Sequence, residues 1–290
     1  MSESRLHELS SHGVSVWIDS LSREMLETGE LQRLIEEDAV VGVTSNPTIF
    51  QKALAEGDRY DAQLRALDAG DPVEAFFALA MDDIRAACDL MRPIWERTAG
   101  VDGWVSLEVD PTLAYDRERT FEQAMRFNRE VGRENLYVKI PATEAGLGAV
   151  EDCIARGTPI NVTLIFSLER YAAVAEAYRR GLERLVAAGG DPSCVLSVAS
   201  FFVSRVDTEA DRRLEQVGPE ELVRERRGRR VLDPGVAAAG GNQESKHANG
   251  PPCEVRGFVA HGRAGRAGVP ARRRWLRALR PRSPGRSRRS

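Results

Sequence analysis

Lysine, histidine and cysteine are scarce in this chain of 290 residues, and their positions exclude several kinds of site. The 41 Lys and Arg residues include only three lysines, namely Lys52, Lys139 and Lys246. The four cysteines are widely scattered, and the four histidines lie outside the segments with a regular apolar pattern. This spacing argues against a disulfide framework, a zinc site and a histidine-based catalytic triad.

Long apolar runs are missing as well. No run approaches the roughly 18–20 residues that a membrane-spanning helix needs. Residues 1–11 lack the basic segment and the following apolar stretch of a secretory signal. With the scattered, reduced cysteines, these absences predict a cytoplasmic protein that has no membrane partner.

The net charge of −3 conceals two unlike parts. Residues 1–223 contain 23 basic and 40 acidic residues, whereas residues 224–290 contain 18 basic and 4 acidic ones. The second part is also rich in Arg, Gly, Ala and Pro, and such a composition cannot offset the entropy cost of ordering the chain. We therefore expect an acidic folded domain over 1–223 and a disordered Arg/Gly/Pro-rich tail over 224–290.

Short apolar runs alternate with longer helical patterns in the acidic part. Strands are predicted at 14–20, 40–46, 104–110, 136–142, 160–166 and 195–202, and helices at 30–38, 72–96, 117–131 and 168–188. This alternation predicts an α/β fold with parallel strands, either a (β/α) barrel or a doubly wound sheet. No glycine-rich phosphate loop follows the first strand, which disfavours a dinucleotide-binding sheet.

Polar residues stand at or near the end of each predicted strand, where barrel enzymes place their active sites. The candidates for catalysis or substrate binding are Asp19, Asn46, Glu108, Lys139, Asn161, Thr163, Ser200 and Arg205.

Lys139 is the most informative candidate because it interrupts an apolar run that should be buried on both faces. Burial disfavours the ammonium form and gives an amine suited to Schiff-base formation with a carbonyl. The alternative is structural: the side chain reaches solvent at the strand end or pairs with Glu108. The residues alone leave both interpretations open.

The other candidates are each ambiguous when taken singly. Asn161 and Thr163 share one face of a strand and could hold sugar hydroxyls and a water, or bond to neighbouring backbone. Ser200 and Arg205 flank a helix start that could receive a phosphate, although an arginine there is usually solvated.

Glu108, Asp19 and Asn46 also have a structural interpretation beside the functional one. Glu108 could shuttle protons for a buried amine or simply form an ion pair with it. Asp19 could act in catalysis or cap the next helix, and Asn46 before Pro47 could mark only a turn and a helix start.

Taken together, these residues resemble the transaldolase family in its longer bacterial form. Residues 42–50 read GVTSNPTIF and residues 136–146 read LYVKIPATEAG, like the family's two most specific segments. Supporting segments lie at 17–19, 106–110, 161–167 and 200–205, and the resemblance extends over about residues 13–221. Six motifs in the right order are far more specific than one alone.

The resemblance implies an eight-stranded barrel and a cofactor-free transfer of a dihydroxyacetone unit between sugar phosphates. Lys139 would attack the ketose carbonyl, Asp19 would take the hydroxyl proton, and Glu108 would act through a water held by Thr163. The dihydroxyacetone hydroxyls would be bound by Asn46 and Asn161, and the phosphate by Ser200 and Arg205. Because a protonated imine is the electron sink, no metal is expected.

The chain departs from the family after the sixth strand, since no pattern for two further β/α units follows. Only the first six units are predicted, which leaves two unpaired sheet edges. A reading-frame change near residues 218–224 is the most economical hypothesis. The competing interpretations are a defective transaldolase and, less favoured because the tail has two aromatic residues, a binder of nucleic acid or acidic partners. The sequence predicts no oligomeric state.

Overall fold

The strands form one parallel sheet whose order in space follows their order along the chain. The computed structural model describes residues 5–45, 47–55, 58–67, 70–217 and 255–257. The strands are β1 (Val16–Ile18), β2 (Val40–Thr44), β3 (Trp104–Glu108), β4 (Leu136–Pro141), β5 (Ile160–Ile165), β6 (Ser197–Phe201) and β7 (Val255–Gly257). Neighbouring parallel strands in sequence order imply crossovers on one side of the sheet, as in a barrel rather than a doubly wound fold.

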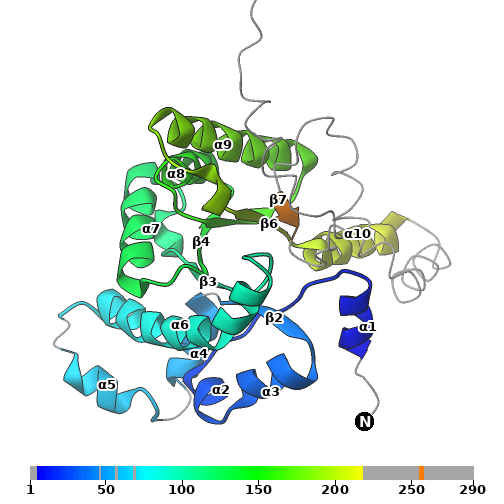
Figure 1. The fold of residues 1–290 in the computed structure, drawn as a ribbon. Coiled ribbons are helices and arrows are strands. Elements are labelled where there is room, and N and C mark those ends of the chain that lie inside the picture. The colour runs from blue at the N-terminus through cyan, green and yellow to red at the C-terminus, as the bar shows by residue number, and fades with distance from the viewer. Residues whose placement is uncertain (1–4, 46, 56–57, 68–69, 218–254, 258–290) are drawn as a thin grey trace, which may run out of the picture.

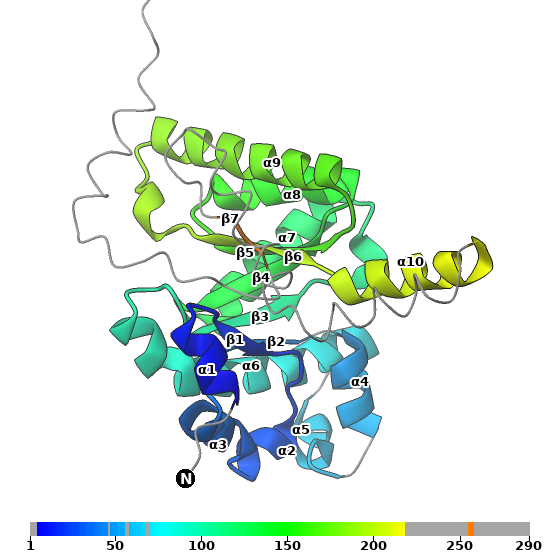
Figure 2. The same ribbon diagram turned by 90° about the vertical axis from the view of Figure 1, so that its right-hand side faces the viewer.

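Helices connect these strands and cover the outer face of the sheet, as Figure 1 shows for α6 to α9. The helices are α1 (Arg5–Ser11), α2 (Arg23–Glu27), α3 (Glu30–Glu37), α4 (Pro47–Ala55), α5 (Asp61–Ala66), α6 (Pro72–Arg97), α7 (Arg117–Val131), α8 (Glu144–Ile154), α9 (Leu168–Ala187) and α10 (Val203–Val217). Figure 2 shows α10 extending from the end of β6, apart from the layer of α7, α8 and α9. None of the helices in the described part of the chain has the length and apolar character of a membrane span.

Side-chain caps explain where the long helices begin. Asp71 accepts a hydrogen bond from the backbone N–H of Val73, and Pro72 occupies the first position of α6. Asp116 caps α7 in the same way, and Gly132 ends that helix with the left-handed φ of 62° that glycine tolerates. The predicted helices at 72–96 and 117–131 are therefore confirmed to within one residue.

Alternate residues of each strand face opposite sides of the curved sheet. The outward positions are apolar and fully buried against the helices, and they include Val43, Val105, Leu107, Val138, Ile140 and Val162. The inward positions are different: near the amino ends of the strands they hold an aromatic cluster in which the rings of Trp104 and Tyr137 stack at 4.0 Å. Toward the carboxyl ends the inward positions are polar, and this is where the candidate site lies.

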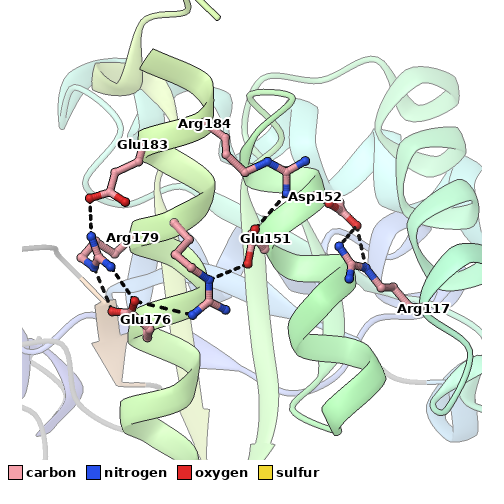
Figure 3. Close-up of polar contacts among 8 residues, drawn as sticks. Arg117, Glu151, Asp152, Glu176, Arg179, Glu183 and Arg184 are labelled. Atoms are coloured by element: carbon pink, nitrogen blue, oxygen red, sulfur yellow. Dashed lines mark hydrogen bonds and ion pairs between the residues drawn. The ribbon is translucent and has the colours of Figure 1, made fainter. Parts of the chain in front are cut away.

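An Arg–carboxylate network ties the outer surfaces of α7, α8 and α9 together (Figure 3). Glu151 on α8 accepts from Arg180 and Arg184 on α9, at 2.7 and 3.0 Å. Asp152, next in the chain, pairs with Arg184 at 2.7 Å and with Arg117 of α7 at the same distance. The arginine side chains are about half exposed, so each pair contributes modestly to stability.

The predicted α/β fold with six β/α units is confirmed, and the strands form an open, curled part of a barrel. The structure adds the short strand β7, which pairs in parallel with β6 over three residues. One of the two sheet edges predicted to be unpaired is therefore partly covered within the described residues. The other residues of the predicted tail lie outside the part of the chain that the structure describes.

Candidate active site

A cavity of about 520 Å³ opens on the inner face of the sheet. Its walls are formed by residues of β1, β2, β4, β5 and β6 and by the first two turns of α10. The lining residues are Ser15, Trp17, Asp19, Thr44, Lys139, Thr163, Ser200, Phe201, Phe202, Val203, Ser204, Asp207 and Thr208. Four of the eight residues predicted from the sequence, namely Asp19, Lys139, Thr163 and Ser200, therefore share one cavity.

Lys139 projects from the middle of the sheet into this cavity and is 5% exposed. Its Nζ lies 3.2 Å from Oε2 of Glu108, the residue directly opposite on β3, and donates to the carbonyl oxygen of Ser45 at 3.5 Å. The lysine does not reach solvent at the strand end, so that part of the structural alternative is wrong. The amine is therefore buried and in contact with a carboxylate at once.

Two carboxylates interact electrostatically with Lys139, and one of them, Glu108, is in direct contact with it. Burial raises the pKa of Glu108 above its ordinary value, Lys139 opposes the rise, and the nearby charge of Asp19 adds to it. Asp19 is more exposed, yet desolvation of its carboxylate also raises its pKa, against the opposing charges of Lys139 and Arg205. Carboxylates that hold protons more readily than usual, beside an amine, are suited to proton transfer.

Asn161 is fully buried and held by hydrogen bonds at both ends of its amide. Its Nδ2 donates to Oγ of Ser106 at 3.0 Å, and its Oδ1 accepts from Oγ of Ser200 at 2.7 Å. This row runs from β3 to β6 across the inner face, level with Lys139, because Lys139 and Asn161 are opposite one another. The amide is thereby fixed in one orientation beside the lysine.

Thr163 follows Asn161 on the same face and is also fully buried. Its Oγ1 has no hydrogen-bond partner among the described residues. The next residue, Leu164, has a left-handed φ of 61°, and the register with β6 shifts between Val162 and Ile165. A non-glycine residue in this conformation is strained, and such strain concentrates at functional sites.

Arg205 is placed differently from the other candidates. It lies in the first turn of α10, is exposed, and its guanidinium carbon is 4.5 Å from the centre of the Phe202 ring. Its charge still reaches the pocket, because it opposes the rise that burial causes in the pKa of Asp19 and of Glu108. A role in phosphate binding stays a prediction. Asn46 lies outside the described residues.

Ser106 had no predicted role, although this residue supplies the acceptor that orients Asn161. The sequence did contain a signal for this position: Ser106 is two residues before Glu108 and must therefore share its face of the strand. Nothing among the described residues forms a cluster of three or more His, Cys, Asp or Glu side chains that could bind a metal ion.

Comparison with known proteins gives a consistent result. The sequence profile of the Transaldolase/Fructose-6-phosphate aldolase family matches residues 16–239. Proteins named transaldolase from Mycobacterium ulcerans and Mycobacterium tuberculosis are each 53% identical over 220 residues, and one from Mycolicibacterium paratuberculosis is 54% identical. These matches cover 75% of this chain and 59% of each relative, so the chain spans about three fifths of their length.

A solved Coccidioides immitis structure assigned to a fructose-1,6-biphosphate aldolase is 14% identical to the chain. The match covers 68% of this chain and 69% of that one, with a TM-score of 0.31.

Proposed function

Because the chain belongs to the transaldolase/fructose-6-phosphate aldolase family, we propose that it transfers a dihydroxyacetone unit between sugar phosphates through a Schiff base on Lys139. The observation that supports this best is a buried amine 3.2 Å from one carboxylate, with a second carboxylate lining the same cavity. The proposed donors are sedoheptulose 7-phosphate and fructose 6-phosphate, and the acceptors are glyceraldehyde 3-phosphate and erythrose 4-phosphate. A cytoplasmic location is part of the same proposal.

In the proposed reaction, the Lys139 nitrogen attacks the ketose carbonyl carbon and the carbonyl oxygen leaves as water, giving a protonated imine. Glu108 moves the protons of these steps, since its carboxylate already contacts Nζ. Asp19 takes the proton from the hydroxyl whose neighbouring C–C bond breaks, and the electron pair of that bond moves into the imine. The aldehyde leaves, another aldehyde adds in reverse order, and water releases the new ketose.

The remaining side chains bind and orient the substrate. Asn161, held by Ser106 and Ser200, has a fixed amide beside the imine nitrogen. The Oγ1 of Thr163 is free to hold the water that the imine steps produce and consume. Asn46 is proposed to bind the dihydroxyacetone unit, and Ser200 and Arg205 to bind the phosphate.

A transfer assay tests the proposal. Sedoheptulose 7-phosphate and glyceraldehyde 3-phosphate are mixed with the full chain, and erythrose 4-phosphate is measured by mass spectrometry. We expect product with the wild-type chain and none with Lys139→Arg, which keeps the charge but cannot form the imine. Folded wild-type protein that makes no product in this assay contradicts the proposed activity.

A further inference from the structure

Thr44 has an unpaired hydroxyl that faces the cavity and has no role in the reaction described above. The residue ends β2, is 2% exposed, and lines the cavity together with Lys139. Its Oγ1 is buried and has no hydrogen-bond partner among the described residues. Thr163 also lines the cavity with a buried hydroxyl that has no partner among the described residues. It lies on β5, on the opposite side of Lys139.

The surrounding contacts fix Thr44 in position. The next residue, Ser45, donates from both its backbone N–H and its hydroxyl to the carbonyl of Ser106, at 3.3 and 3.0 Å. The carbonyl of Ser45 accepts from Lys139, so the end of β2 is anchored to β3 and to the amine. The hydroxyl therefore has a defined place near the reacting nitrogen.

The side of the cavity that Thr44 occupies follows from the strand pairing. Trp17 is opposite Gly42, and a Cβ on that glycine would overlap the Trp17 ring at 2.2 Å, so both positions face inward. Thr44 and Asp19 are each two residues further along, which puts both at the same inward level of adjacent strands. The Thr44 hydroxyl thus lies on the Asp19 side of Lys139.

A buried hydroxyl without a partner destabilises the folded state, because it loses its hydrogen bonds to water and gains none in return. The buried threonines away from the cavity, Thr120 and Thr158, avoid that cost. Thr120 on α7, which is 1% exposed, donates to the carbonyl of Leu113 at 2.8 Å. An unpaired hydroxyl that faces a cavity can form a hydrogen bond with a polar atom of a bound ligand.

We propose that Thr44 is a further substrate-binding residue, whose hydroxyl bonds to a hydroxyl of the ketose attached to Lys139, on the Asp19 side. This inference rests on the proposed function and adds to it a binding residue on β2. The hydroxyl contributes to affinity for the polyhydroxylated donor and contributes nothing to the stability of the free protein.

The test compares three variants of the full chain. Thr44→Val removes the hydroxyl and keeps the shape, Thr44→Ser restores a hydroxyl, and Thr120→Val removes a hydroxyl that is already paired. For each, the melting temperature is measured without ligand. The amount of borohydride-trapped adduct on Lys139 is then measured against fructose 6-phosphate concentration.

For Thr44→Val we expect the half-saturating concentration to rise by about tenfold, with a melting temperature equal to or above that of wild type. Thr44→Ser should saturate close to wild type. For Thr120→Val we expect the reverse, a melting temperature lower by about 2–4 °C and unchanged saturation.

Two results overturn the assignment of Thr44. One is a Thr44→Val variant that saturates like wild type. The other is a Thr44→Val variant that loses as much stability as Thr120→Val, because its hydroxyl then has a partner within the protein. A wild-type chain that forms no adduct contradicts the proposed function itself, and the Thr44 assignment fails with it.

Discussion

The outer helical layer and the inner face of the sheet hold their polar groups in opposite ways. Outside, the acidic groups of α8 are each matched by one or two arginines from neighbouring helices, and the partners are half exposed (Figure 3). Inside, one buried lysine is shared by two carboxylates. Two buried threonine hydroxyls beside it have no partner among the described residues.

This difference separates polar groups that serve the fold from those that serve a ligand. The outer pairs are screened by water and can be lost one at a time at small cost. The inner groups lose their interactions with water when the chain folds, and contacts within the protein replace these only in part. They therefore lower the stability of the free protein until a ligand supplies the missing hydrogen bonds. Stability and activity should therefore respond independently to changes on the two surfaces.

The double variant Lys139→Met/Glu108→Gln should show the largest effect. Transfer activity should fall by about three orders of magnitude or more, because the covalent route is lost. Stability should stay the same or rise, because replacing a buried ion pair with neutral side chains is often neutral or stabilising by about 1–4 kcal/mol. Transfer assays and urea unfolding check both parts. A double variant that is much less stable than wild type would show that the inner charges serve the fold.

Ser106→Ala leaves the Nδ2 of Asn161 buried without an acceptor. We expect a loss of about 1–3 kcal/mol in the free energy of unfolding, together with a lower kcat because the amide is no longer oriented. Ser197→Ala is the matched control, since Ser197 is equally buried but donates to the carbonyl of Ile160 on the outward side. The control should keep its kcat; equal kcat values for the two variants would contradict the role given to Ser106.

The raised pKa of Glu108 predicts a pH-dependent contribution to stability. A carboxyl whose pKa is higher in the folded state favours folding most below its ordinary value of 4.5, and this advantage is lost as the pH rises through the raised pKa. The melting temperature of wild type minus that of Glu108→Gln should therefore decrease from pH 4 to neutrality. A difference that is constant or grows with pH contradicts the shift.

Arg184→Ala should have the smallest effect. It removes the contacts to Glu151 and Asp152, but Arg180 and Arg117 remain as their partners. We expect a loss of about 0.5 kcal/mol, reduced further at high salt, and unchanged transfer activity. Urea unfolding at two salt concentrations measures this. A loss as large as that of Ser106→Ala would remove the distinction between the two surfaces.

The sequence predicted the parts of the structure that depend on local patterns. Apolar runs located all six strands, and the two-residue period placed Asn161 and Thr163 on one face. Strand ends were less accurate: the strand predicted at 195–202 directly follows a short helical turn that ends at Cys194, and β6 itself begins only at Ser197 and ends at Phe201. The burial of Lys139 followed from its apolar neighbours, whereas its contact with Ser45 required the fold.

Interactions between distant segments could not be predicted. The outer pairs join residues about 30 positions apart whose meeting depends on helix packing. The left-handed Leu164 and the register shift after Val162 lie where β5 pairs with β6, and neither leaves a signal in the composition. The stacking of Arg205 on Phe202 and the pairing of β7 with β6 are likewise tertiary contacts.

The most direct test of a Schiff-base lysine on the inner face is reductive trapping. The full chain is incubated with fructose 6-phosphate and borohydride, digested, and mapped by mass spectrometry, with Lys139→Arg as control. We expect one ketose-derived adduct on the peptide that contains Lys139, and none in the variant. Folded protein without an adduct, or an adduct on Lys52 that persists in Lys139→Arg, would contradict it.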